Sequence, residues 1–161
     1  MLALVVAFCA CAVTGLHVFA AYETRNQSRH ANVAAGKSGW LRAASLGDIA
    51  EGRGTVVQIP GGASVAIFRH GGKLSAISNA CAHQNGPLGE GCIIDGLVTC
   101  PWHGYQYRPE DGCAPAPFTE KLSTYNIALE GRDVLLDPKA NPPGTRVEPL
   151  IVPAAGQGGA V

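Results

Sequence analysis

The sequence predicts a small antiparallel all-β domain, a barrel or sandwich, preceded by one transmembrane helix. Two observations predict the domain: short runs rich in Val and Ile recur along the chain, and turn-forming residues separate them, among 21 glycines and 11 prolines. Closely spaced short strands with such turns are typical of small barrels and sandwiches. A long apolar run at the amino terminus predicts the helix. At 161 residues, the chain has room for one ordinary domain with appendages.

Glycine-containing turns are expected to join most of the strands into hairpins. Gly71–Gly72, Asp95–Gly96 and Gly131–Arg132 each stand between two apolar runs, which is the usual signal for a tight hairpin turn. The expected strands are residues 54–59, 64–70 and 73–78, the two halves of 92–100, and then 124–130 and 133–137.

Residues 2–22 are predicted to form the transmembrane helix. Leu2–Ala21 carries no formal charge, and as a helix it would extend about 30 Å, the thickness of a bilayer's hydrocarbon core. Lys and Arg follow this run but do not precede it, so the domain is expected to face the cytoplasm. A secretory signal peptide, which would place the domain in the periplasm or outside the cell, is the alternative interpretation. The chain could also be the carboxy-terminal piece of a larger membrane protein.

The rest of the chain divides by composition into three parts. Residues 23–39 read as a polar linker, residues 40–138 as the folded domain, and residues 139–161 as a tail rich in Pro, Gly and Ala that lies along the domain or stays mobile. Lys plus Arg and Asp plus Glu number 12 each. No overall basic field exists to attract nucleic acid, and we expect no such partner.

Two loops each contain one cysteine and one histidine. Cys81 and His83 lie in NACAHQNGPLGEG, and Cys100 and His103 lie in VTCPWHGYQY. Each motif follows a predicted strand, so the two loops can close on one metal site. Two Cys and two His would suit tetrahedral zinc, but zinc sites usually keep the two Cys together and the two His together. Here each loop mixes the two types.

The order CxH, sixteen residues, CxxH resembles the signature of the Rieske family, in which two Cys hold one iron of a [2Fe–2S] cluster and two His hold the other. The segments GWLRAASLGDIAEG and YNIALEGRDVLLD also look like Rieske-domain segments, and the resemblance covers roughly residues 39–138. It implies a Rieske-type fold with a cluster-binding subdomain and one cluster per chain. Cys81 and Cys100 would bind the inner iron, and His83 and His103 the outer, solvent-facing one.

Departures from the respiratory cytochrome bc branch of that family bear on the reduction potential. Gly86 and Trp102 stand where that branch has two cysteines that form a disulfide, so this bridge is expected to be missing. Tyr105 replaces a serine hydrogen-bond donor of that branch, whereas Tyr107 keeps its tyrosine donor. Fewer donors to the cluster stabilise its reduced form less, and we expect a potential near the low end of the Rieske range, about −150 mV.

Several further residues carry expectations of their own. Cys92 and Cys113 are expected to be small buried hydrophobes or free thiols, with a disulfide between them left open. His70 is expected on the solvated surface, and Phe68 in the core. Trp102, which lies between two candidate ligands, either shields the cluster from water or docks a partner. Glycines near the two loops are expected to permit unusual backbone turns.

The leading functional expectation is a membrane-anchored one-electron carrier that passes electrons between a redox partner and an acceptor. The sequence shows no nucleotide loop and no nucleophile beside a base, so no independent catalytic site is visible. One alternative is the electron-entry part of a ring-hydroxylating oxygenase system. The oxygenase's own iron ligands would have to lie elsewhere, because the tail lacks histidine. Another is a ferric-reductase-like membrane haem protein, to which His17 in the apolar run points. A structural iron or zinc module is the last.

Overall fold

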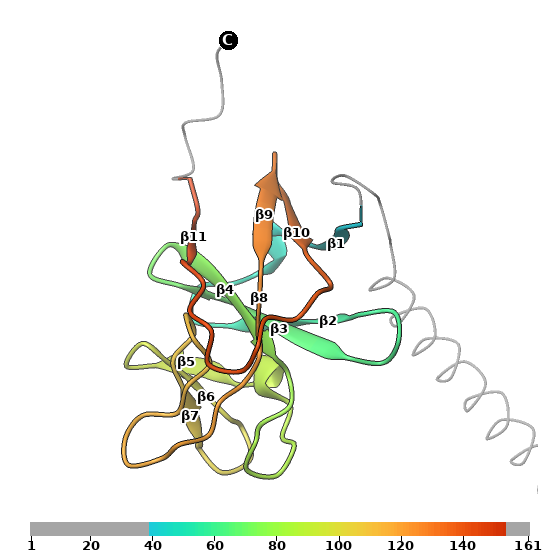
Figure 1. The fold of residues 1–161 in the computed structure, drawn as a ribbon. Helices are drawn as coiled ribbons and strands as arrows, with labels where there is room; N and C mark the ends of the chain where they lie inside the picture. The colour runs from blue at the N-terminus through green and yellow to red at the C-terminus, as the bar shows by residue number, and fades with distance from the viewer. Residues whose placement is uncertain (1–38, 154–161) are drawn as a thin grey trace, which may run out of the picture. The chain divides into compact units, whose positions relative to one another are not determined.

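The computed structural model describes residues 39–153, which form an all-β domain (Figure 1). The predicted transmembrane helix at residues 2–22 lies outside the described residues, and so does almost all of the linker at 23–39. Across residues 39–153, no helix is long and apolar enough to cross a membrane.

Three antiparallel sheets make up the described part of the chain. The first contains β1 (Leu41–Ser45), β10 (Asp133–Leu136) and β9 (Ile127–Glu130), in that order. The second runs β11 (Leu150–Ile151), β4 (Lys73–Ser78), β3 (Ser64–His70) and β2 (Gly54–Gln58), and β8 (Thr124–Tyr125) also pairs with β4. The third consists of β5 (Cys92–Ile94), β6 (Leu97–Thr99) and β7 (Gln106–Tyr107). Two short 3₁₀ helices, η1 (Leu46–Asp48) and η2 (Leu88–Glu90), complete the fold.

The three predicted hairpins are present. β3 pairs with β4 across Gly71–Gly72, β5 with β6 across Asp95–Gly96, and β9 with β10 across Gly131–Arg132. Both residues of the first two turns have positive φ, as a type I′ turn requires. The predicted strand 124–130 is broken at Asn126 because its two halves pair with different sheets, β8 with β4 and β9 with β10. Three strands, β1, β7 and β11, were not predicted from the sequence.

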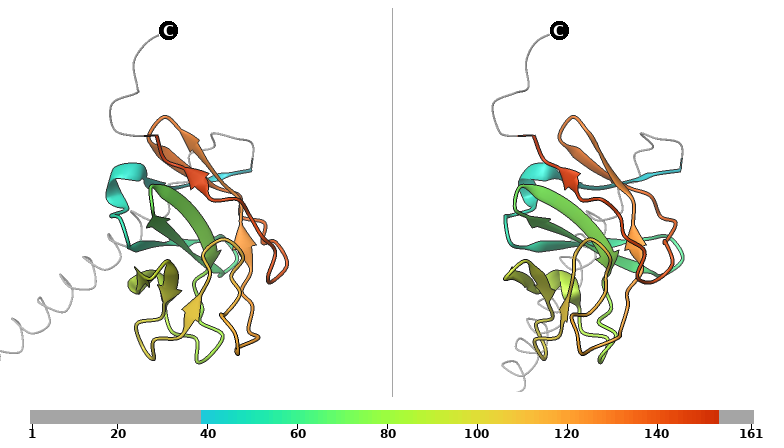
Figure 2. Two further views of the ribbon diagram at one scale, coloured as in Figure 1. Left: turned by 90° about the vertical axis from the view of Figure 1, so that its left-hand side faces the viewer. Right: turned by 60° about the vertical axis from the view of Figure 1, so that its left-hand side comes forward.

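β3 and β4 form the partition between two hydrophobic cores. Along β3, Val65 and Ile67 belong to one core, whereas Ala66 and Phe68 belong to the other. Successive side chains of a strand point to opposite faces, so a strand buried on both sides reads as an unbroken apolar run. One core lies against the sheet β1–β10–β9. The other contains Cys81, Cys100 and Tyr107 and lies on the side of β5, β6 and β7. Figure 2 shows β5, β6 and β7 on the opposite side of β3 and β4 from the hairpin of β9 and β10.

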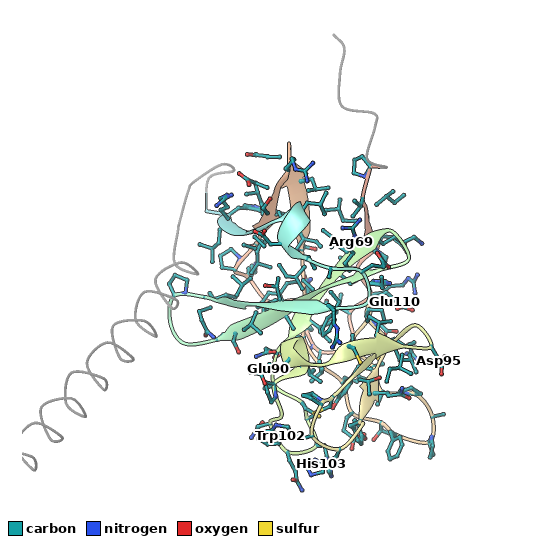
Figure 3. All side chains as sticks on the ribbon, turned by 180° about the vertical axis from the view of Figure 1, so that it is seen from behind. Arg69, Glu90, Asp95, Trp102, His103 and Glu110 are labelled. Carbon is teal, nitrogen blue, oxygen red and sulfur yellow. The ribbon has the colours of Figure 1, made fainter. Side chains whose placement is uncertain are left out.

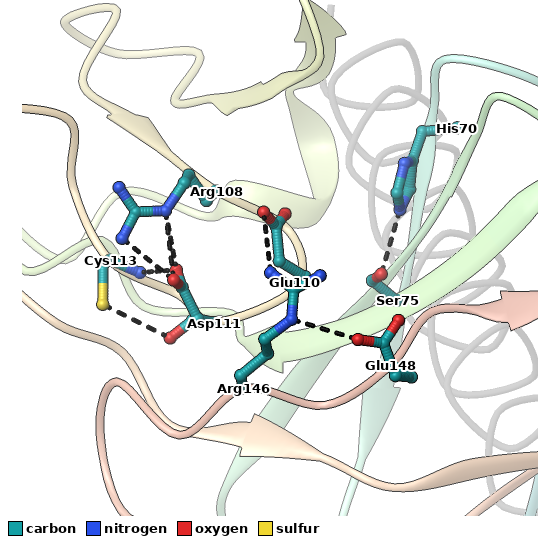
Figure 4. Close-up of polar contacts among 8 residues, drawn as sticks. All are labelled: His70, Ser75, Arg108, Glu110, Asp111, Cys113, Arg146 and Glu148. Atoms are coloured by element: carbon teal, nitrogen blue, oxygen red, sulfur yellow. Dashed lines mark hydrogen bonds and ion pairs between the residues drawn. The ribbon is translucent and has the colours of Figure 1, made fainter.

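The described part of the tail, residues 139–153, lies along the domain. β11 pairs with β4, and the backbone N–H groups of Asn141, Gly144 and Val147 donate to carbonyls of the domain. Arg146 forms ion pairs with Glu110 and Glu148 (Figure 4). This segment therefore covers the edge of β4 that would otherwise present unpaired backbone groups.

Candidate metal centre

The two candidate ligand loops share one backbone plan. In the first, the N–H of Cys81 donates to the carbonyl of Gly86, and the carbonyl of Cys81 accepts from Asn85. In the second, the N–H of Cys100 donates to the carbonyl of Tyr105, and the carbonyl of Cys100 accepts from Gly104. Asn85 and Gly104, at equivalent places, both have positive φ, of 59° and 70°. Each loop is thus a closed turn that begins at its cysteine, and only the position of the histidine differs.

The four candidate ligands divide into a buried pair and an exposed pair. Cys81 is 1% exposed and Cys100 is 3% exposed, whereas His83 and His103 are exposed. The two imidazole rings lie edge to face with centroids 5.1 Å apart, and the two thiols are close enough to interact. Across residues 39–153, no three His, Cys, Asp or Glu side chains gather as ligands of one ion. The ligands meet two by two, with sulfur inside and nitrogen at the surface.

Groups able to donate hydrogen bonds lie near both sulfur atoms. The Tyr107 hydroxyl lies 3.4 Å from the Cys81 Sγ and accepts a hydrogen bond of 2.9 Å from the Ala82 N–H. Burial raises the pKa of the Cys100 thiol, an effect that the backbone N–H of Trp102 and then that of His103 oppose. Buried thiols without a partner charge stay protonated. Donors aimed at them therefore suit thiolates that a metal has deprotonated.

Gly86 is required by lack of space rather than by its backbone conformation. A Cβ built on this residue would lie 2.7 Å from the Cys100 Sγ and 3.2 Å from the Trp102 Cδ2. Gly89 and Gly91 are similarly crowded. Of the four glycines near the two loops, Gly86, Gly89, Gly91 and Gly104, only Gly104 has the positive φ of an unusual turn. The contact also shows that positions 86 and 102 are neighbours, and as Gly and Trp they form no disulfide.

A third loop, residues 108–122, supports the outer face and was not anticipated from the sequence. The Tyr105 ring lies nearly parallel to that of His83, with centroids 5.5 Å apart, and Phe118 packs on Tyr105 at 4.9 Å. The Tyr105 hydroxyl is shielded and forms no hydrogen bond of regular geometry with a described residue. Burial, and after it the nearby Glu120 carboxylate, raise its pKa to about 12. Tyr105 thus supports an imidazole where the respiratory branch has a small donor.

The remaining residues singled out in the sequence have mixed outcomes. Cys92 and Cys113 are free cysteines, and Phe68 is fully buried. Trp102 is 57% exposed beside His103, a position that favours docking over shielding. His70 is not simply solvated: it is half-buried with Nε2 2.9 Å from the Ser75 Oγ, and burial lowers its pKa (Figure 4).

An all-β domain with two Cys–His loops at one end defines an iron–sulfur protein of the Rieske type, and the comparisons agree. The Rieske [2Fe–2S] domain model matches residues 39–126, and the chain belongs to this family. The ferredoxin subunit of 3-phenylpropionate/cinnamic acid dioxygenase from Shigella flexneri is 35% identical over 107 residues, which are 63% of this chain and 97% of that protein. The Escherichia coli K12 protein of the same name is 34% identical over the same length.

Solved structures give the same fold. The ferredoxin of carbazole 1,9a-dioxygenase from Nocardioides aromaticivorans superimposes with a TM-score of 0.57 at 26% identity and covers 62% of this chain and 98% of that one. A ferredoxin from Sphingomonas yanoikuyae superimposes with a TM-score of 0.55 at 26% identity, over 60% and 96%. The protein is therefore a Rieske-type electron-transfer protein, and its cofactor is a Rieske-type [2Fe–2S] cluster.

Proposed function

We propose that Cys81 and Cys100 hold the inner iron of the cluster, that His83 and His103 hold the outer iron, and that the chain works as a ferredoxin. The observation that carries this proposal is the division of the four side chains, with both sulfurs buried and both imidazoles exposed at the same end of the domain. The residues fit such a group because two ligands are available for each of two irons and donors already face the sulfurs.

When bound, a Rieske cluster accepts and releases one electron. The residues of this chain decide where that electron enters and leaves. Anionic thiolates disfavour added negative charge more than neutral imidazoles do, so an added electron would favour the side that His83 and His103 would hold. Because the His83 and His103 rings are exposed, a partner can come into contact with that side directly. Tyr107 and the N–H groups of the second loop stabilise charge on the sulfurs from the protein side.

The acceptor that we propose is the oxygenase component of a ring-hydroxylating dioxygenase. The support is that relatives named as dioxygenase ferredoxin subunits match this chain over nearly their whole length. In this proposal the carrier supplies electrons to an iron that another protein holds. We therefore place the chain in an oxygenase system rather than beside a membrane haem protein.

Membrane attachment through residues 2–22 stays a prediction from the sequence. Its test is fractionation of cells that express the full chain, followed by alkaline extraction of the membranes. A chain that stays in the membrane after extraction supports a spanning helix, and one that appears in the wash contradicts it. A shortened mature protein, detected by mass, would support the signal-peptide interpretation instead.

The ligand assignment is tested by iron content and electron paramagnetic resonance of the purified full chain. We expect two irons per chain and a signal that appears only on reduction, with a midpoint near about −150 mV. Replacing any one of the four ligands by Ala should abolish this signal. Cys92→Ala and Cys113→Ala are matched controls that should keep it, because both cysteines lie outside the four-ligand group. A full signal after loss of His83 or Cys100 contradicts the assignment.

The proposed acceptor is tested by mixing the reduced chain with the oxidised oxygenase of a 3-phenylpropionate/cinnamic acid dioxygenase. Reoxidation of the cluster together with reduction of the oxygenase supports the proposal. An intact, reducible cluster that transfers no electrons to the oxygenase contradicts this acceptor and leaves the carrier role in place.

A further inference from the structure

Three segments at the end of the domain that holds the candidate ligands carry no formal charge. Residues 80–87, 100–107 and 113–119 include no Asp, Glu, Lys or Arg, although 15% of the whole chain is charged. The ion pairs among the described residues all lie outside these three loops. In Figure 3, Trp102 and His103 lie at the lower end, and Glu90, Asp95, Glu110 and Arg69 lie above them. These three segments are thus free of formal charge.

Two aromatic side chains stand exposed on the same loops. Trp102 is 57% exposed and its ring lies 6.4 Å from that of His103. Phe118 is 55% exposed and packs on Tyr105, which in turn stacks on His83. Trp102 is therefore a direct neighbour of His103, and Phe118 is linked to His83 through the Tyr105 ring. We call this surface the aromatic tip; it consists of Trp102, Phe118 and the rings of His83 and His103.

Both aromatic residues are held in place rather than loosely attached. Trp102 rests against Gly86, where a Cβ would be 3.2 Å from the indole. Phe118 belongs to a loop closed by the hydrogen bond from the Ala114 N–H to the Glu120 carbonyl and by the bridge between Cys113 and Lys121. A preordered aromatic side chain loses little conformational entropy when a partner covers it, and exposed Trp is a preferred anchor of protein interfaces.

The Glu120 carboxylate reaches the edge of the tip. The Glu120 pKa is lowered by its interaction with Tyr105 and, among smaller causes, by His83, so its carboxylate is ionised at neutral pH. A single charge at the rim of an interface contributes little and is screened by salt. The surface on which a partner would rest remains uncharged.

From these observations we infer that the aromatic tip docks an electron-transfer protein partner whose contact surface is also apolar and uncharged, with Trp102 and Phe118 as the two anchors. This inference rests on the proposed function and specifies the chemistry of the partner. Charged partners meet at rates that fall steeply with salt, because their encounter is steered by opposite fields. Association through the aromatic tip should instead be nearly independent of salt.

A lipid bilayer is the competing occupant for exposed aromatic residues. Surfaces that bind bilayers usually place Lys or Arg beside the aromatic residues. Residues 80–87, 100–107 and 113–119 include neither, and the nearest basic residues of the third loop, Arg108 and Lys121, lie outside these segments. His83 and His103 belong to the aromatic tip together with Trp102 and Phe118. A partner that covers the tip therefore contacts the two imidazoles through which we propose that electrons leave. Both observations favour a protein.

The experiment follows electron transfer from the reduced full chain to the oxidised oxygenase of a 3-phenylpropionate/cinnamic acid dioxygenase in a stopped-flow instrument. For the unaltered chain, the second-order rate constant should change by less than about threefold between about 50 and 500 mM NaCl. A fall of about tenfold or more contradicts an uncharged contact while leaving the carrier role intact. This measurement needs no variant and so does not depend on how any variant folds.

Variants then test the anchors. The double substitution Trp102→Ser and Phe118→Ser should lower the rate constant at least about tenfold at both salt concentrations. Ile151→Ser is the matched control: Ile151 is 72% exposed, but β11 pairs it with Lys73, at the opposite end of β4 from Cys81. The reduction potential of each variant is recorded to show that the cluster is unchanged. An unaffected rate in the double variant overturns the inference.

Two further measurements distinguish the proposed oxygenase partner from a second copy of this chain and from a lipid bilayer. If the oxygenase accepts no electrons, the proposed acceptor fails, and electron self-exchange between oxidised and reduced copies of the chain tests the tip instead. The same weak salt dependence and the same loss in the double variant are then expected. Binding to phosphatidylcholine vesicles that is lost in the double variant but kept in the Ile151→Ser control would overturn a protein partner in favour of a bilayer.

Discussion

Replacing Tyr107 by Phe should lower the reduction potential of the cluster by about 20–60 mV. The Tyr107 hydroxyl is the side-chain donor placed next to the Cys81 sulfur, at 3.4 Å, and the residue is fully buried. A net hydrogen bond contributes about 0.5–1.5 kcal/mol. For a one-electron couple, about 1.4 kcal/mol corresponds to 59 mV. If the hydrogen bond stabilises the reduced cluster by this free energy more than it stabilises the oxidised cluster, its loss lowers the reduction potential by the corresponding amount of about 20–60 mV.

The same substitution should lower the free energy of unfolding by about 1 kcal/mol, because the Ala82 N–H loses the hydroxyl that accepts its hydrogen bond. The aromatic ring stays, so no cavity opens in the core around Val98 and Ala114. Tyr125→Phe is a matched control, since Tyr125 is also buried but belongs to the other core. It should leave the potential unchanged.

The assay is a redox titration of the purified full chain, followed by electron paramagnetic resonance, with iron content measured on the same samples. A potential that stays within about 10 mV of the unaltered chain, at full iron content, would refute the reasoning, because it would mean that the hydroxyl does not favour the reduced state. Loss of iron in the variant would show instead that the hydroxyl serves mainly to build the first loop.

Three other predictions follow from the described contacts. Gly86→Ala should lower iron occupancy and destabilise the domain by about 1–3 kcal/mol, because its Cβ would be forced against the Cys100 Sγ; full occupancy in iron analysis contradicts this. Truncation after Asp137 should cost about 2–4 kcal/mol in denaturant unfolding, because several backbone hydrogen bonds and the cover of β4 are lost; an unchanged midpoint refutes it. Burial disfavours ionisation of Asp111, but hydrogen bonds from Arg108 and the backbone outweigh it and lower its pKa. This contribution is present above about pH 4 and lost as the pH falls through the folded-state pKa. Asp111→Asn should therefore lose stability at pH 7 and approach the unaltered chain in acid, and a deficit that is constant with pH contradicts the assignment.

Local sequence patterns were sufficient for the strands that make hairpins with their neighbours. Gly71–Gly72 and Asp95–Gly96 specify tight turns by themselves, and the strands on either side follow. The strands β1, β7 and β11 were not predicted from the sequence, because they are short or pair with strands far away in the chain. Their pairing depends on neighbours that become adjacent only in the folded domain. The break at Asn126 has the same origin, because two sheets divide one apolar run between them.

The sequence by itself was sufficient to predict the family and the cofactor, and it proposed the four candidate ligands, because the order CxH, sixteen residues, CxxH resembles the Rieske signature. Only the tertiary structure decided that both sulfurs are buried and both imidazoles exposed. It also decided that Tyr105 supports His83 and that Trp102 faces solvent. Spacing along the chain limits which residues can be ligands, whereas burial and ring stacking depend on the third loop and on the core beneath, which the chain supplies from distant segments.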